Sequence, residues 1–131
     1  MPTYKSSVSI EARPEEVFTF LSDVRNLPTF VEGMAAAEPL GGEAVRVTVD
    51  IEGEQRTGEA WFRIKEGHHP RIEFGVEGPH GYRGWLEVDR EGQVCSVTAE
   101  VQTERPSDRA MDESIDRTLF ALKDRIEGSG T

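Results

Sequence analysis

Hydrophobic and polar residues alternate along much of this chain. From Tyr4 to Glu11, the apolar Val8 and Ile10 alternate with serines, which is the period of a half-buried β-strand. Residues 34–102 continue this alternation, interrupted about every twelve residues by turns that contain glycine. The pattern predicts a strand near the N-terminus and a meander of six further antiparallel strands. The turns of the meander are expected at Gly41-Gly42, Gly53-Glu54, Gly67 to Pro70, Gly78 to Gly81 and Glu91-Gly92.

Two short helices are predicted between the first strand and the meander. Pro14 suits the first turn of a helix, because its missing N–H costs nothing there. Apolar residues follow at the spacing i, i+3, i+4 and i+7, which forms one hydrophobic stripe. The members of this stripe are Val17, Phe20, Leu21 and Val24. A second short helix is expected around Pro28, carrying Phe30 and Val31.

A long amphipathic helix is predicted at the C-terminal end of the chain. Ser107 or Asp108 can act as its N-cap, and Gly128 is expected to stop it. Its hydrophobic stripe consists of Met111, Ile115, Leu119, Leu122 and Ile126. The predicted order is therefore one strand, two short helices, six strands and one long helix.

Tight turns also predict which side chains share a face of the sheet. Closing a hairpin on Gly53-Glu54 sets Val47 opposite Ala60. The later turns set Phe62 opposite Phe74, Phe74 opposite Leu86 and Leu86 opposite Val97, so the same phase extends to all six strands. One row of the apolar face then holds only small residues, namely Ala36, Val47, Ala60, Val76, Gly84 and Ala99, with Gly58 beside it. Small residues under a long helix predict a cavity, since ligand sites favour concave apolar spaces. The alternative is that Met111, Leu119 and the phenylalanines fill the space.

The pocket predicted from this register is lined by residues of the strands and of the long helix. One end of it is expected to be polar, because the register brings Arg56 close to His80 and Tyr82. A buried Arg needs a carboxylate or a ligand anion, whereas an Arg at a strand end can reach water instead. The full set of predicted pocket residues is Ala36, Val47, Val49, Arg56, Gly58, Ala60, Phe74, Val76, His80, Tyr82, Gly84, Ala99, Val101, Met111, Ile115 and Leu119.

The opposite face of the sheet carries two tryptophans. The predicted register places Trp61, Gly75 and Trp85 in one row. Aromatic side chains often cover a glycine on a neighbouring strand. Tryptophan is also enriched at interfaces, so this face could instead form a homodimer.

Candidate catalytic and metal-binding groups are few. Glu66, His68 and His69 are potential ligands, but adjacent histidines in a turn rarely converge on one ion and no remote ligand is evident. Cys95 falls on the inward phase, where it is expected to be a small buried residue. No phosphate-binding loop, dinucleotide-binding loop or nucleophile motif occurs. We therefore predict neither a metal nor a cofactor, and assign no catalytic residue.

Composition limits the class of partner. The formal net charge of −10 opposes sequence-independent binding to nucleic acid or to anionic membranes. The single cysteine allows no intrachain disulfide. No segment has the apolar run of a signal peptide or of a membrane span. We expect one domain over residues 1–131, located in the cytoplasm.

The segments "SVSIEARPEEVFTFLSDVRNLPTF" and "RGWLEVDREGQVCSVTAEVQ", followed by the terminal helix, resemble the START-like helix-grip superfamily. The likeness is greatest to its polyketide cyclase/dehydrase-like (SRPBCC) branch and spans nearly the whole chain. It implies an α+β helix-grip fold, in which a seven-stranded curved antiparallel sheet surrounds a long C-terminal helix, with two short helices after the first strand. It also implies a hydrophobic cavity between sheet and helix. Members bind lipids, sterols, polyketides, quinones or plant hormones, and a minority catalyse cyclisation, dehydration or hydrolysis.

Three functions are compatible with these observations. The first is binding or carrying of a small hydrophobic molecule, one that could bear an anionic head facing Arg56. The second is a polyketide cyclase or aromatase-like enzyme that uses Arg56, His80 or Tyr82. The third is an interaction module whose cavity is filled by its own side chains and whose Trp61/Trp85 face meets a partner. Fold alone does not decide between them.

Overall fold

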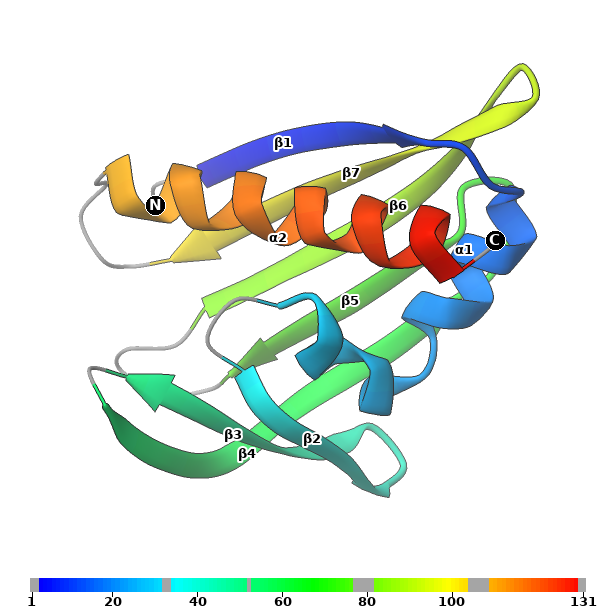
Figure 1. The fold of residues 1–131 in the computed structure, drawn as a ribbon. Coiled ribbons are helices and arrows are strands. Elements are labelled where there is room, and N and C mark those ends of the chain that lie inside the picture. Colours follow the sequence, from blue (N-terminus) through cyan, green and yellow to red (C-terminus); the bar gives the residue numbers. More distant parts are fainter. Residues whose placement is uncertain (1–2, 32–33, 52, 77–81, 104–108, 130–131) are drawn as a thin grey trace.

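The structure is a computed structural model that describes residues 3–31, 34–51, 53–76, 82–103 and 109–129. Its elements follow the predicted order (Figure 1). The N-terminal part comprises β1 (Thr3–Ile10), α1 (Pro14–Leu21) and the 3-10 helix η1 (Val24–Thr29). The remaining elements are β2 (Met34–Gly41), β3 (Ala44–Ile51), β4 (Glu54–Lys65), β5 (Arg71–Val76), β6 (Tyr82–Glu91), β7 (Val94–Thr103) and α2 (Arg109–Ser129).

The strands form one seven-stranded antiparallel sheet in the order β1-β7-β6-β5-β4-β3-β2. Figure 1 shows the sheet curving, with α2 lying across its inner side and α1 and η1 near one end. Consecutive strands of the meander are neighbours, and β1 pairs with β7 and forms one edge of the sheet. The predicted α+β helix-grip architecture is therefore confirmed.

Polar contacts fix α2 over the β1 side of the sheet. The Ser6 hydroxyl donates to the carboxylate of Asp116. Further along the same flank of α2, Lys123 Nζ donates to the Ser9 carbonyl (2.8 Å) and Glu127 accepts from the Glu11 main-chain N–H (2.9 Å). The hydrogen bond from Glu11, helped by the ammonium of Lys123, lowers the pKa of Glu127 below its ordinary value. The helix is thus attached along one flank, and its other flank faces the β3–β5 half of the sheet.

Apolar residues of the sheet and both helices form the core. The largest side chains that are almost completely enclosed include Ile10, Leu21, Ile72, Leu119 and Leu122. Cys95 is also buried, as predicted, and this desolvation raises the pKa of its thiol. The inward phase read from the alternation agrees with the burial on β6 and β7, whereas on β4 it is buried only at Phe62, and Ile64 is exposed.

The register of three hairpins differs from the prediction by two residues. Val47 lies opposite Gly58 instead of Ala60, Phe74 lies opposite Gly84, and Leu86 lies opposite Ala99. The β4–β5 pairing of Phe62 with Phe74 was predicted correctly.

The difference in register arises where the turns close. On β6–β7, Glu91 pairs with Val94, so the turn consists of Gly92 and Gln93 and not of Glu91-Gly92. Gly92 adopts a φ of 60°, a conformation that glycine adopts readily. Moving a turn by one residue changes the pairing by two, which leaves every side chain on the same face. The shift therefore leaves the predicted face of each side chain unchanged, but it changes which residues stand in one row across the strands.

The prediction of which β2 side chains face the core was wrong. An irregularity between Met34 and Ala36 places Ala36 opposite Thr48 and Ala37 opposite Val47. Ala37 is buried in consequence, whereas Ala36 is exposed. A bulge of this kind adds one residue on one strand and reverses the side-chain phase beyond it.

Three further predictions concern helix ends and turns. α2 continues through Gly128 to Ser129, so the glycine does not stop the helix where expected. The predicted N-cap at Ser107 or Asp108 and the turn from Gly78 to Gly81 lie outside the described residues.

Candidate ligand cavity

An apolar cavity of about 240 Å³ lies between the sheet, η1 and α2. Three parts of the chain line it. The segment around η1 contributes Leu27, Phe30, Val31 and Met34; the sheet contributes Val45, Val47, Ala60, Trp61, Phe62, Ile72, Phe74, Gly75, Leu86, Ala99 and Val101; and α2 contributes Ile115, Thr118 and Leu119.

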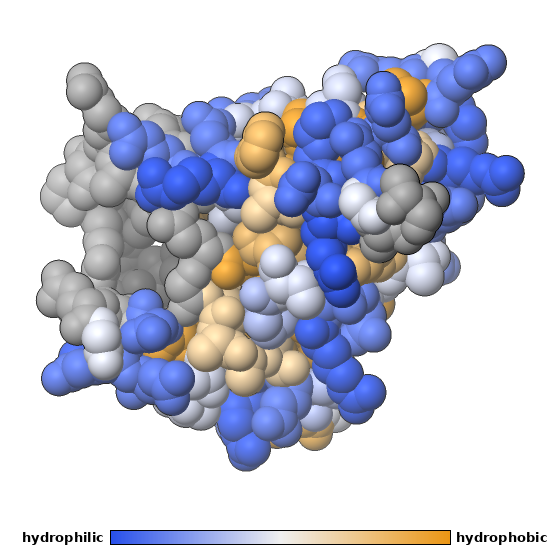
Figure 2. Space-filling view, in the orientation of Figure 1, coloured by the Kyte–Doolittle hydropathy of each residue, from blue (hydrophilic) through white to orange (hydrophobic). Residues whose placement is uncertain are grey.

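The way α2 is attached explains where this cavity lies. Because its polar flank contacts β1, α2 covers the β1–β7 side and leaves space over β3 to β5. The segment that follows η1 closes that space from the other side, with Phe30 almost completely buried. Figure 2 shows hydrophobic residues exposed in a band that runs from α2 towards η1 and the start of β2. The apolar interior therefore continues to the surface between these elements.

Part of the predicted pocket set lines this cavity. Seven of the predicted residues border it: Val47, Ala60, Phe74, Ala99, Val101, Ile115 and Leu119. They lie on four different strands and on α2. Alternation along the sequence therefore identified residues that are distant along the chain but border the same cavity.

Other predicted residues do not border the cavity. Val49 and Val76 are half-buried outside its lining, Gly58 is exposed with open space beside it, and Ala36 is exposed beyond the bulge of β2. Gly84 is buried but leaves no room: a Cβ built on it would lie 2.5 Å from the Glu100 carbonyl oxygen and 3.0 Å from the Phe74 ring. The expected row of small residues does not exist, because the register shift sets Phe74 beside Gly84.

The predicted polar end is not formed by Arg56. Its side chain is 70% exposed, and its guanidinium lies 3.6 Å from the Glu54 carboxylate near the start of β4. An arginine at a strand end that reaches water was the alternative considered, and it is the arrangement that the structure has. His80 and the side chains of Tyr82 and Met111 lie outside the described part of the structure.

Several lining residues were not predicted as pocket residues. Phe30 and Val31 were assigned to the second short helix, and Leu27 and Met34 flank them. Nothing in the sequence alone says that this segment folds against the open half of the sheet. Thr118 was missed because the stripe of α2 was read from apolar residues, although Thr118 has the spacing of the stripe, three residues after Ile115 and four before Leu122.

The described lining is almost entirely apolar. Thr118 supplies a hydroxyl, and no ionisable side chain borders the cavity among the residues described. A charged group placed here would lose its hydration without gaining a countercharge from these residues. The lining of the cavity thus favours a neutral, hydrophobic ligand.

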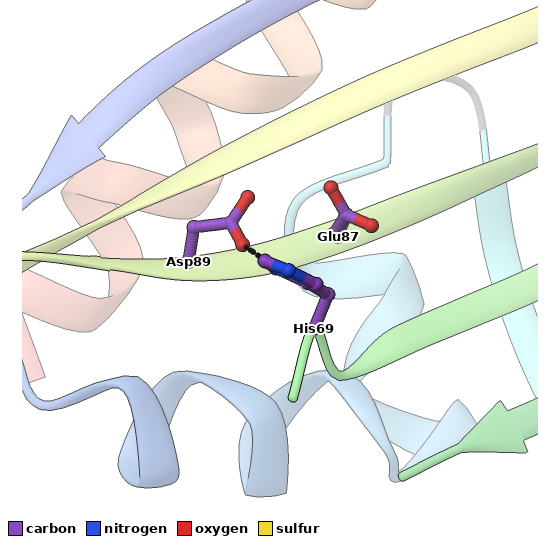
Figure 3. Close-up of side chains that lie close together, drawn as sticks. All are labelled: His69, Glu87 and Asp89. Carbon is purple, nitrogen blue, oxygen red and sulfur yellow. Dashed lines mark hydrogen bonds and ion pairs between the residues drawn. The ribbon is translucent and has the colours of Figure 1, made fainter. Parts of the chain in front are cut away.

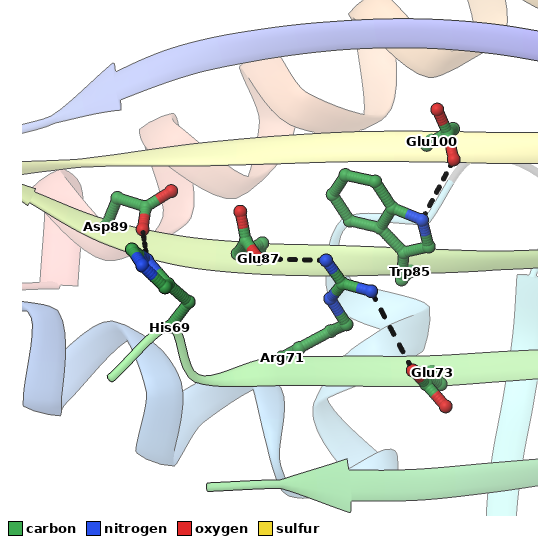
Figure 4. Close-up of polar contacts among 7 residues, drawn as sticks. All are labelled: His69, Arg71, Glu73, Trp85, Glu87, Asp89 and Glu100. Atoms are coloured by element: carbon green, nitrogen blue, oxygen red, sulfur yellow. Dashed lines mark hydrogen bonds and ion pairs between the residues drawn. The ribbon is translucent and has the colours of Figure 1, made fainter. Parts of the chain in front are cut away.

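The two tryptophans stand on the outward phase of the sheet, although Trp61 and its partner Gly75 also border the cavity, and their environments differ. Trp61 lies opposite Gly75, and a Cβ at Gly75 would come within 2.6 Å of the indole, so the expected aromatic cover is present. Trp85 lies opposite Glu73 instead, which corrects the predicted row. Its indole N–H donates to Glu100 (2.9 Å), and the Arg71 guanidinium lies 4.2 Å from the ring centre (Figure 4).

Of the three potential metal ligands in the β4–β5 turn, only His69 lies in a cluster with other ligand-type side chains. His69 Nδ1 lies 2.7 Å from Asp89 Oδ1 on β6, with Glu87 nearby (Figure 3). Glu66 and His68 are exposed and do not belong to this group. The two carboxylates could not be assigned to His69 from the sequence pattern because they lie on another strand, with Asp89 separated from His69 by 20 positions.

Comparison with known proteins identifies the family. Residues 1–127 match the family described as polyketide cyclase/dehydrase and lipid transport. The chain belongs to this family. The resemblance to START-like SRPBCC proteins is thereby confirmed, while no curated protein matches the sequence significantly.

Solved structures share the fold of this polyketide cyclase/dehydrase family member at low sequence identity. The di-domain aromatase/cyclase BexL of the BE-7585A biosynthetic pathway aligns with a TM-score of 0.80 and 21% identity, over 97% of this chain and 47% of that one. The chain thus spans about half the length of that protein. The Thermus thermophilus protein TTHA0849 gives a TM-score of 0.78 and 18% identity, over 99% and 100% of the two chains. A START superfamily protein from Mycobacterium smegmatis gives 0.70 and 14%, over 97% and 95%.

Proposed function

We propose that this protein binds and carries a small, neutral, hydrophobic molecule in the cavity between the sheet and α2. The observation that carries the proposal is the apolar lining of about 240 Å³, which the described side chains leave unfilled. An unfilled apolar space costs stability, so a fold that keeps one gains stability when a ligand occupies it.

The size of the cavity limits the ligand. Sites for drug-sized molecules measure roughly 300–1,000 Å³, so a cavity of about 240 Å³ suits a ligand at or below the lower end of that class. A flat molecule of one or two rings, or a short branched chain, fits this description. Large multi-ring molecules would require the cavity to widen.

The lining supports a neutral ligand over an anionic one. No Lys, Arg or His borders the cavity in the described residues, and Arg56 is engaged with Glu54 in solvent. We therefore do not retain the anionic head expected from the sequence.

An enzymatic role is the second candidate, and the observation in its favour is the family itself. BexL is a di-domain aromatase/cyclase, and this chain resembles about half of it. General acid–base catalysis, however, needs a titratable group within hydrogen-bonding reach of the substrate. The described lining contains no such carboxylate or imidazole. Binding without turnover is thus the simpler function for this cavity.

Two measurements test the proposal. Native mass spectrometry of freshly purified protein should detect a retained molecule of low mass that is released by organic solvent. Titration with N-phenyl-1-naphthylamine, a neutral apolar fluorophore, should give a saturable increase in emission with one site per chain. A non-saturable signal equal to that of an unrelated acidic protein would contradict ligand binding.

No helix in the described ranges combines the length and hydrophobicity needed to cross a bilayer.

The homodimer through Trp61 and Trp85 stays a prediction. Both indoles already have intrachain contacts, with Gly75 and with Glu100. Sedimentation of the wild type and of Trp85→Ala at several concentrations would test whether they also meet a second copy.

A further inference from the structure

His69, Glu87 and Asp89 form a compact cluster on the outer face of the sheet (Figures 3 and 4). His69 lies in the turn that precedes β5, and both carboxylates project from β6. One nitrogen or oxygen from each of the three lies within 4.8 Å of the others. The cluster combines an imidazole with two carboxylates, a mixed set of ligands typical of transition-metal sites.

The backbone holds these three residues in place. Arg71 pairs with Glu87 in the β5–β6 ladder, and the Val88 N–H donates to the Pro70 carbonyl (2.9 Å), which extends the ladder beyond β5. Continuing the same register sets His69 opposite Asp89. Residues two apart on neighbouring strands share one face, so the cluster is a consequence of regular strand pairing.

We propose that His69, Glu87 and Asp89 bind Zn²⁺ or a similar divalent transition-metal ion. Zinc bonds to nitrogen and oxygen of about 2.0–2.2 Å in a tetrahedron place the ligand atoms roughly 3.3 Å apart. The observed separations, from 2.7 Å between His69 and Asp89 up to the 4.8 Å limit, bracket that value. Small rotations of the side chains bring all three onto one ion, and water completes the coordination.

Charge and second contacts agree with this assignment. The two carboxylates would neutralise the divalent ion, and Arg71 Nη2 donates to Glu87 Oε1 (2.9 Å), which fixes the orientation of that carboxylate. Hydrogen bonds to a ligating carboxylate are a common feature of metal sites. The side chain of His69 is 70% exposed, so an ion can reach it from solvent.

The site is separate from the ligand cavity. Leu86 and Val88 alternate with Glu87 and Asp89 along β6 and point into the core, so the cluster lies on the other side of the sheet. The ion would connect the turn before β5 to β6 and would not touch a molecule in the cavity. Its proposed effect is stabilisation of this edge of the hairpin.

Isothermal titration of the untagged protein with ZnCl₂ in a non-coordinating buffer tests the proposal. We expect one ion per chain, with affinity reduced roughly tenfold or more by His69→Ala and by Glu87→Gln. His68→Ala is the matched control, since this adjacent exposed histidine is outside the cluster. MgCl₂ should give no binding that depends on His69, because magnesium prefers oxygen ligands.

The thermal midpoint provides a second readout on the same proteins. Zinc should raise the midpoint of the wild type and of His68→Ala but not that of His69→Ala. Absence of a 1:1 event, equal affinity in His69→Ala, or equal loss in His68→Ala would each overturn the site. None of these results bears on fluorophore uptake, so the cavity and the metal site are tested independently.

Discussion

The ring of Phe74 packs against Gly84 on the neighbouring strand, where a Cβ would lie only 3.0 Å from the ring. This contact fills the inner face of the sheet at β5–β6. Ala60 and Ala99 border the cavity together with Phe74, whereas Gly84 does not. The packing of Phe74 against Gly84 thus removes one of the small residues expected in the lining.

The two covered glycines are expected to respond differently to substitution. Gly84→Ala should destabilise the protein by about 1–3 kcal/mol, because the new Cβ meets the Glu100 main chain at 2.5 Å. The nearest atoms that the new Cβ of Gly75→Ala meets belong to the Trp61 side chain, so adding Trp61→Ala should relieve its cost. Urea unfolding of the single and double mutants measures this coupling. Additive losses for Trp61 and Gly75 would contradict the proposed contact.

Arg56→Ala should leave ligand binding unchanged. The guanidinium is exposed and pairs with Glu54, and ion pairs in solvent contribute little to stability. We expect the affinity for the neutral fluorophore to stay within about twofold of the wild type, and the affinity for a carboxylated analogue to change no more than that. A selective loss for the anionic analogue would show that Arg56 reaches the bound ligand.

The attachment of α2 to β1 should weaken in acid. The pKa of Glu127 is lower in the folded protein than in the unfolded chain, so its stabilising effect is present above the unfolded pKa and is lost as pH falls through the folded pKa. Glu127→Gln should therefore lower the urea midpoint at neutral pH and match the wild type in strong acid. Glu113→Gln, whose ion pair lies within α2, is the control. A difference that persists in strong acid would assign the effect to packing.

Cys95 should react slowly with thiol reagents in the folded protein. It is completely buried, and desolvation raises the pKa of the thiol, so both access and thiolate content are low. Labelling by an aromatic disulfide reagent at neutral pH is expected to follow unfolding, with rapid reaction only in denaturant. Fast labelling of the native protein would indicate local opening of β7.

Alternation along the chain predicted the strands and their inward faces, including Ala60, Ala99 and Val101 of the cavity. These predictions held because a two-residue shift in register, as at Gly92, keeps each side chain on its face. Contacts between rows were not predictable in this way. They depend on which residues close each turn, and the expected row of small residues failed because Phe74 lies beside Gly84.

Irregular and tertiary features lay beyond the sequence pattern. The bulge that exposes Ala36 and buries Ala37 changes no residue type, since both are alanine, so composition gives no sign of it. The approach of Asp89 to His69 likewise requires knowing that β5 and β6 pair in this register. The lining segment around Phe30 depends on how η1 packs beside β2, which local periodicity does not encode.

The most direct test of the proposed ligand cavity compares fluorophore binding by two variants, in each of which one alanine is replaced by leucine. Ala60→Leu places a larger side chain in the cavity lining, whereas Ala36→Leu places the same side chain on an exposed position of β2. We predict that N-phenyl-1-naphthylamine binds Ala36→Leu as it binds the wild type and binds Ala60→Leu at least roughly tenfold more weakly, with both variants folded by circular dichroism. Equal binding by Ala60→Leu and the wild type would show that this cavity is not where the protein holds an apolar ligand.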